Sequence, residues 1–204
     1  MIKGYYFITD SALSRKGSIS DVENAIDAGA TVVQYRNKEG CSRNIYEEAL
    51  ELKKICSSAR FIINDRVDIA LAVDADGVHI GRKDMPYEAA RYLLGKSKII
   101  GMTVHSMGEA LEAEKKGADY LGVGPIFATT TKRDIEQPCG TSLIREIKKV
   151  CEIPVAAIGG INLDNAGNVI KAGADAICAI SAVITKSDVR KEIEKFQALF
   201  IREK

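Results

Sequence analysis

The chain has 204 residues, of which 46% are hydrophobic, enough for one sizeable core, and this length predicts a single domain over residues 1–204. Its 29 basic and 28 acidic side chains leave a net charge of +1, so neither nucleic acid nor an anionic membrane is expected as the main partner. The sequence shows no apolar run of roughly 18 residues that would predict a transmembrane helix, and its first residues lack the pattern of a signal peptide. A cytoplasmic protein is expected.

The cysteines and histidines restrict the chemistry further. Five cysteines are widely spread and include no Cys-x-x-Cys pair, which argues against both a disulfide framework and a zinc knuckle. Only His79 and His105 are present, so a site with several imidazole ligands cannot form. A metal in this protein is expected to be a hard cation held by oxygen atoms, and Mg²⁺ is the natural candidate.

Short segments rich in Val and Ile alternate with amphipathic helical stretches along the chain. The eight predicted strands cover residues 5–10, 31–36, 60–65, 76–81, 98–104, 119–124, 154–160 and 175–181. Helical apolar stripes lie between them, and a last stripe at 189, 193, 196 and 200 follows the eighth strand. This pattern predicts an α/β fold, a compact (β/α)8 TIM barrel. A doubly wound open sheet is the structural alternative.

A weak internal repeat supports the barrel. Related tetrapeptides at 28–31, 73–76, 116–119 and 172–175 stand at predicted helix-to-strand junctions, where glycine can adopt the left-handed conformation that ends a helix. Their second residues are 45, 43 and 56 positions apart. The surplus in the third interval lies in the non-periodic segment 125–140, which follows the sixth strand. It predicts a lid or binding loop at the barrel mouth, with a tolerated surface insertion as the alternative.

Polar residues collect at the carboxyl ends of the predicted strands. They are Gln34, Arg36 and Lys38 at the end of the second strand, Asn64, Asp65 and Arg66 at the third, His79 at the fourth, followed by Gly81 and Asp84, Thr103 and His105 at the fifth, and Ser181 at the eighth. Arg36, Lys38 and Lys132 can neutralise a phosphate or diphosphate, and Asp65 with Asp84 can hold one Mg²⁺ that bridges the same phosphates. The mixture predicts a diphosphate ester bound with its metal.

Simpler roles remain open for several of these residues. Asp65 can be a helix N-cap, and Asp84 can cap a helix or form a turn. The alternation of the polar residues on strand two also fits a solvated edge, although a barrel has no edge strands. His79 fits a packed residue near the rim better than a ligand, and its spacing leaves the role of His105 open.

Glycines predict a second phosphate site. Gly159-Gly160 follows the seventh strand and Ile180-Ser181 closes the eighth, at the two loops that frequently bind phosphate in barrels through backbone N–H groups. Simple turns are the alternative. The mouth is thus expected to hold two anionic groups, a metal-bound diphosphate and a monophosphate.

These motifs resemble the thiamine phosphate synthase family of compact (β/α)8 enzymes over nearly the whole chain. The matching segments are VVQYRNK (32–38), INDRVDIALAVDADGVHIGRKDMP (63–86), IIGMTVHS (99–106), DYLGVGPIFATTTK (119–132), PVAAIGGI (154–161) and ICAISAV (177–183). The resemblance implies contacts to hydroxymethylpyrimidine diphosphate from Gln34, Arg36, Lys38, Asn64, Thr103 and Lys132. It implies contacts to the thiazole phosphate from Thr129, Thr131, Gly160, Ile180 and Ser181, and Mg²⁺ binding by Asp65 and Asp84.

The resemblance also implies the reaction. Hydroxymethylpyrimidine diphosphate and hydroxyethylthiazole phosphate would condense to thiamine phosphate and diphosphate, with Arg36, Lys38 and Lys132 and the metal stabilising charge as diphosphate leaves. No protein nucleophile is required. Four positions depart from the usual family pattern, and they are Tyr35, Asn37, Thr103 and Ala128. We expect Tyr35 to point away from the mouth, because it alternates with Gln34 and Arg36.

Two other functions compete with the synthase. A related tautomerase uses a histidine in the loop after strand five, where His105 stands, but it has no diphosphate for Asp65, Asp84 and the loop 129–132 to bind. A catalytically silent barrel that binds thiamine precursors is the second alternative. Small-molecule substrates, without nucleic acid or membrane, are the expected partners, and the sequence leaves a homo-oligomer open.

Overall fold

The computed structural model describes residues 2–129, 131 and 137–202, and its eight parallel strands close into a barrel in chain order. The strands are β1 Gly4–Ile8, β2 Val32–Tyr35, β3 Arg60–Asn64, β4 Gly77–Ile80, β5 Ile99–Val104, β6 Tyr120–Val123, β7 Val155–Ile158 and β8 Ala176–Cys178. Pairing of β1 with β8 completes the ring. The predicted (β/α)8 barrel is confirmed.

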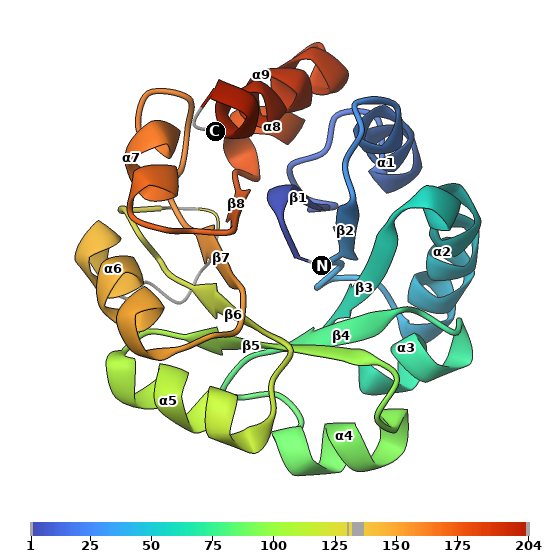
Figure 1. The fold of residues 1–204 in the computed structure, drawn as a ribbon. Coiled ribbons are helices and arrows are strands. Elements are labelled where there is room, and N and C mark those ends of the chain that lie inside the picture. Colours follow the sequence, from blue (N-terminus) through green and yellow to red (C-terminus); the bar gives the residue numbers. More distant parts are fainter. Residues whose placement is uncertain (1, 130, 132–136, 203–204) are drawn as a thin grey trace.

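Helices surround the strands on the outside of the barrel (Figure 1). They are α1 Ser18–Asp27, α2 Ser42–Ile55, the 3-10 helix η1 Cys56–Ser58, α3 Val67–Ala72, α4 Tyr87–Leu94, α5 Met107–Lys116, α6 Gly140–Val150, α7 Ala166–Lys171, α8 Ser181–Ile184 and α9 Val189–Arg202. The predicted final stripe lies on α9, where Ile193 and Phe196 are fully buried. Among the described residues, no helix combines the length and the apolar character needed to cross a bilayer.

The strands are shorter than the sequence pattern predicts, because their polar ends already belong to the loops of the mouth. After β7, Gly159 and Gly160 adopt φ values of 102° and 65°, which lie outside the strand region and favour glycine. After β8, Ser181 begins α8 instead of closing the strand as expected. The chain therefore turns sharply where the second phosphate site was predicted.

The tetrapeptide repeat has a structural cause at the opposite end of the barrel. Gly29, Gly117 and Gly173 all adopt positive φ, and Asp74, with φ 51°, occupies the same place in the remaining copy. In three copies the last residue is an aspartate whose carboxylate accepts the N–H of a residue near the start of the preceding strand. These aspartate links are Asp76 to Phe61 at 3.0 Å, Asp119 to Ile100 at 2.8 Å and Asp175 to Val155 at 2.8 Å.

Candidate active site

Arg36 follows β2 directly and is held by a carboxylate from the neighbouring strand end. Its Nη1 lies 2.5 Å from Asp10 Oδ2, and the two side chains are 14% and 6% exposed. The Arg36 N–H donates to the hydroxyl of the buried Thr9 at 2.8 Å. This pairing fixes the guanidinium at the mouth, because a charged group at such low exposure needs a partner. Neither Asp10 nor Thr9 is among the site residues predicted from the sequence.

Lys38, Asp65 and Asp84 form the second charged group at the mouth. Lys38 makes an ion pair with Asp65, and Asp84 Oδ2 accepts the N–H of Gly81 at 2.7 Å. Burial, together with a hydrogen bond to Asp65 and its like charge, raises the pKa of Asp84. The three loops thus bring the predicted cation and both predicted metal ligands together.

The simpler role proposed for Asp65 is not found. The N-cap of α3 is Arg66, with no side-chain cap hydrogen bond, and Asp65 itself takes a left-handed φ of 62°. Such a conformation is uncommon outside glycine and occurs where the surroundings impose it. For Asp84, the bond to Gly81 confirms the turn alternative, which is compatible with a second role for its carboxylate.

The adjacent carboxylates of Asp65 and Asp84 suit a hard divalent cation. Among the described residues, no three His, Cys, Asp or Glu side chains converge in a metal-binding group. Mg²⁺ commonly uses only one or two protein carboxylates and completes its shell with water and substrate phosphates. A cation between them would also offset the like charge of Asp65, which adds to the effect of burial in raising the pKa of Asp84. The two residues therefore fit the predicted metal.

The uncharged predicted contacts project from neighbouring strands. Gln34, only 3% exposed, donates from Nε2 to the hydroxyl of Tyr6 at 2.8 Å. Thr103 bonds through Oγ1 to Nε2 of His79 at 2.8 Å. Asn64 is half-buried and pairs in register with His79. Parallel pairing places these side chains on the interior side of the barrel, as alternation along the strands predicts.

The residues predicted to bind the monophosphate lie in the loops after β6, β7 and β8. Gly160 is packed so closely that a Cβ there would lie 2.5 Å from the carbonyl oxygen of Ala128. Thr129 Oγ1 accepts the N–H of Thr131 at 3.3 Å, and Ile180 precedes Ser181 at the start of α8. Lys132 lies outside the described residues.

Two backbone hydrogen bonds join the beginning and the end of the long loop after β6. The N–H of Cys139 donates to Pro125 at 2.9 Å, and the N–H of Gly140 donates to Ile126 at 3.1 Å. The first part of the loop also continues the pairing with β7, since the N–H of Phe127 donates to Gly159 at 3.0 Å. Burial raises the pKa of the Cys139 thiol, as expected for a passive cysteine.

Comparison with known proteins identifies the family. A family sequence model described as "Thiamine monophosphate synthase" matches residues 5–183. The chain belongs to this family. It is 54% identical over 193 residues to the thiamine-phosphate synthase of Methanosarcina barkeri. This alignment covers 94% of this chain and 88% of the relative. For the Chloroflexus aurantiacus thiamine-phosphate synthase the identity is 51% over 197 residues, covering 95% and 91%.

A solved structure supports the same family. The thiamine phosphate pyrophosphorylase of Pyrococcus furiosus is 45% identical to this chain, with a TM-score of 0.90 and coverage of 98% of this chain and 96% of that one. The family and enzyme class implied by the sequence motifs are therefore confirmed.

Two departures from the family pattern have structural roles in this chain. As expected, Tyr35 points away from the mouth, and its hydroxyl donates to Glu48 on α2. Asn37 Oδ1 accepts the N–H of Glu39 at 3.1 Å and of Gly40 at 2.9 Å. Such a side-chain turn stabilises a loop, so Asn37 shapes the segment that carries Lys38.

His105 is engaged by the backbone around it. Its Nδ1 contacts the carbonyl oxygen of Gly124, which can only accept, so this nitrogen carries the hydrogen. The backbone N–H of His105 donates to Oε2 of Glu109 at 2.6 Å. These contacts orient the imidazole at the junction of β5 and the β6 loop without requiring it for proton transfer.

Proposed function

We propose that the protein condenses hydroxymethylpyrimidine diphosphate with hydroxyethylthiazole phosphate to give thiamine phosphate and diphosphate. The observation that carries this proposal is the charge arrangement of the mouth. Arg36 and Lys38 are each paired with a carboxylate, and Asp65 lies close enough to Asp84 to contribute to raising its pKa. A metal-bound diphosphate needs both signs of charge side by side, which a simple phosphate pocket does not.

The residues divide the work of binding and charge stabilisation. Arg36, Lys38 and Lys132 would bind diphosphate oxygens and stabilise the charge that develops as the C–O bond at the pyrimidine methylene breaks. Asp65 and Asp84 would hold Mg²⁺, which when bound neutralises charge on the leaving diphosphate. The electron pair of that bond leaves with diphosphate, and the thiazole nitrogen supplies the pair for the new C–N bond. Gln34, Asn64 and Thr103 would orient the pyrimidine substrate.

The second substrate would bind on the other side of the mouth. Thr129, Thr131, Gly160, Ile180 and Ser181 would hold the thiazole phosphate through hydroxyl and N–H groups. Support comes from the close packing of Gly160 against Ala128, which holds the loop after β7 next to the loop that carries Thr129 and Thr131. This arrangement would direct the thiazole ring toward the pyrimidine methylene.

The decisive assay mixes purified protein with both substrates and Mg²⁺ and measures thiamine phosphate and diphosphate. We expect the two products in equal amounts, no product when either substrate is omitted, and no product after chelation with EDTA until Mg²⁺ is restored. Lack of a coupled product with every divalent ion tested would overturn the synthase. An isomerised thiazole alone would indicate a tautomerase, and binding without turnover would indicate a silent barrel.

The metal assignment has its own test. Asp65→Asn and Asp84→Asn should each weaken Mg²⁺ activation by at least about tenfold, since a charged ligand is replaced by a neutral one. Asp68→Asn is a suitable control, because its carboxylate is 63% exposed and pairs with Arg66. Full Mg²⁺-dependent activity in both Asp65→Asn and Asp84→Asn would show that these residues do not bind the metal.

A further inference from the structure

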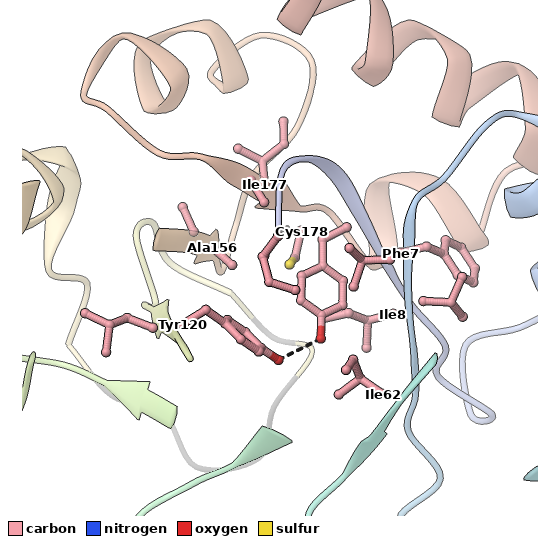
Figure 2. Packing of buried hydrophobic residues seen from close by; sticks show 14 of the residues in the cluster. Phe7, Ile8, Ile62, Tyr120, Ala156, Ile177 and Cys178 are labelled. Atoms are coloured by element: carbon pink, nitrogen blue, oxygen red, sulfur yellow. Dashed lines mark hydrogen bonds between the residues drawn. The ribbon is translucent and has the colours of Figure 1, made fainter. Parts of the chain in front are cut away.

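A continuous chain of hydrogen bonds crosses the barrel interior beneath the mouth. It runs from Gln34 on β2 through Tyr6 on β1, Tyr120 on β6 and His79 on β4 to Thr103 on β5. The distances are 2.8 Å from Gln34 to Tyr6, 2.8 Å between the tyrosine hydroxyls, 2.9 Å from Tyr120 to His79 Nδ1 and 2.8 Å from His79 Nε2 to Thr103. Figure 2 shows the bond between the tyrosine hydroxyls as a dashed line. The chain therefore joins two of the predicted pyrimidine contacts.

Two glycines make room for the rings of this chain. A Cβ on Gly101 would lie 2.1 Å from the ring of Tyr120, and a Cβ on Gly122 would lie 2.7 Å from Cε1 of His79. No other residue fits at either position without displacing a ring. Tyr120 is fully buried and His79 half-buried. The barrel thus holds both rings in place, and the hydrogen-bonded atoms cannot easily change partners.

The number of hydrogens on each group determines which atom donates in each of these hydrogen bonds. Gln34 donates its amide N–H to Tyr6. Given that bond, only one set of directions leaves an acceptor in these bonds for both tyrosine hydrogens: Tyr6 donates to Tyr120, and Tyr120 donates to His79 Nδ1. Burial raises the pKa of both tyrosines well above the ordinary value, so each keeps its proton. With Nδ1 accepting, a neutral His79 carries its hydrogen on Nε2 and donates it to Thr103 Oγ1.

We propose that His79 is a positioning residue that directs the hydroxyl hydrogen of Thr103 toward the mouth, where it donates to the pyrimidine diphosphate. The identity of that ligand rests on the proposed function. Because Thr103 Oγ1 already accepts from His79, its own hydrogen is left for the substrate, whose phosphate oxygens can only accept. A Cβ built on Gly81 would lie 3.1 Å from Asp84 Oδ2 and 4.0 Å from Thr103 Oγ1, so the hydroxyl borders the diphosphate region.

The first test reads the tautomer directly in the protein without substrates. Long-range ¹H–¹⁵N spectra distinguish the two neutral imidazole forms. The protein has only two histidines, so a His105→Gln variant assigns the signals. We expect His79 to carry its hydrogen on Nε2, and we expect Tyr120→Phe to move it toward a mixture of forms. A hydrogen on Nδ1 of His79 in the wild-type protein would mean that the hydrogen bonds run in the opposite direction, and it would overturn the proposal.

The second test uses steady-state kinetics. Tyr120→Phe should lower kcat/KM for the pyrimidine diphosphate about tenfold, the effect of one hydrogen bond, and leave KM for the thiazole phosphate unchanged. In a Thr103→Val background, which lacks the hydroxyl, Tyr120→Phe should cause no further loss. Tyr87→Phe is the matched control, since it deletes a hydroxyl of a buried tyrosine that donates to Gly117 at 2.6 Å on the outside of the barrel.

The two tests separate the proposal from the proposed function. Equal kcat/KM for Tyr120→Phe and Tyr87→Phe, or an undiminished effect of Tyr120→Phe in the Thr103→Val background, would overturn the positioning role. Absence of synthase activity in the wild-type protein would overturn the proposed function, yet the tautomer of His79 could still be read from its spectrum.

Discussion

Asp10 belongs to the candidate site, although it is not among the site residues predicted from the sequence. It comes from the end of β1 and holds Arg36 through the ion pair at 2.5 Å. A free arginine side chain of this length samples many rotamers, so its partner determines whether the guanidinium is already oriented when the diphosphate arrives. We therefore expect Asp10 to act on substrate binding through Arg36.

We predict that Asp10→Asn lowers kcat/KM for the pyrimidine diphosphate by about 10- to 100-fold, because a hydrogen bond to a charged group contributes about 1.5–3 kcal/mol. Initial-rate measurements at varied substrate concentration check this. The control is Asp27→Asn, whose carboxylate is 65% exposed and lies 3.7 Å from Arg190. If Asp10→Asn and Asp27→Asn gave the same kinetics as the wild-type protein, Arg36 would need no partner.

Single residues show where sequence reasoning succeeds and where it stops. The rule that polar groups collect at strand ends found Arg36, Asp65 and Asp84, and applied to the first strand it would also have found Asp10. Tyr6 and Tyr120 carry no such signal, because buried barrel strands are apolar on both faces and an aromatic residue there indicates packing. Their hydroxyls acquire partners only when the barrel closes.

At the scale of elements, Asp76 is an aspartate link with two further cationic partners. Asp76 accepts from Lys53 at 2.8 Å and Arg60 at 3.2 Å besides the N–H of Phe61. Burial opposes its ionisation, but these hydrogen bonds outweigh burial and lower the pKa of Asp76. A lowered pKa in the folded state means that ionised Asp76 stabilises the fold at neutral pH.

We therefore predict that Asp76→Asn lowers the free energy of unfolding by about 1–2 kcal/mol at pH 7. The loss should shrink as the pH falls below about 4, the ordinary pKa of aspartate, and through the lower folded value, because wild-type Asp76 then becomes neutral as well. Urea unfolding at several pH values measures it. Asp74→Asn is the control, since Asp74 is exposed and asparagine tolerates its left-handed φ; a pH-independent loss in Asp76→Asn would contradict the argument.

The loop after β7 gives a second prediction at this scale. Gly160→Ala places a Cβ 2.5 Å from the Ala128 oxygen at a φ of 65°, so we expect about 1–3 kcal/mol of destabilisation. KM for the thiazole phosphate should rise. Gly167→Ala in α7, with no atom within 4 Å of the new Cβ, should instead stabilise the protein by about 0.5–1 kcal/mol. Unfolding curves and initial rates compare them, and similar behaviour of both variants would refute the close-packing argument.

The predicted strand ends differ from the structure for a reason that also belongs to the elements. The predicted strand over 154–160 includes Gly159 and Gly160, although β7 ends at Ile158. Positive φ at Gly159 and Gly160 ends the strand, and sequence alone shows that glycine permits this conformation, not that it occurs. The adjacency of Asp65 and Asp84 depends on the same kind of loop geometry.

At the scale of the whole molecule, the barrel closes where β1 pairs with β8, and α9 packs against β1. The ring of Tyr5 stacks on Phe196 of α9, with centroids 5.2 Å apart and an interplanar angle of 21°. The next residue, Gln197, accepts the N–H of Tyr5 at 3.2 Å and donates to the carbonyl of Gly29 at 3.0 Å. The last helix thereby connects the first strand with the end of α1.

We predict that Phe196→Ala lowers the free energy of unfolding by about 3–5 kcal/mol, the usual loss for a buried phenylalanine. Denaturant unfolding followed by far-UV circular dichroism measures this change. Ile201→Ala on the same helix, at a side chain that is 76% exposed, should leave the midpoint nearly unchanged. A small effect of Phe196→Ala would mean that α9 contributes little to closure.

The aspartate links also define which parts of the barrel can be exchanged between related proteins. They join β3 to β4, β5 to β6 and β7 to β8, and in the first copy the hydroxyl of Thr31, just before β2, donates to the carbonyl of Lys3, just before β1, at 3.4 Å. These contacts divide the eight strands into four pairs, called modules here, each with its own side-chain contact. Recombination between relatives at module boundaries keeps every such contact within one parent, whereas a crossover inside a module separates an aspartate from the amide that it binds.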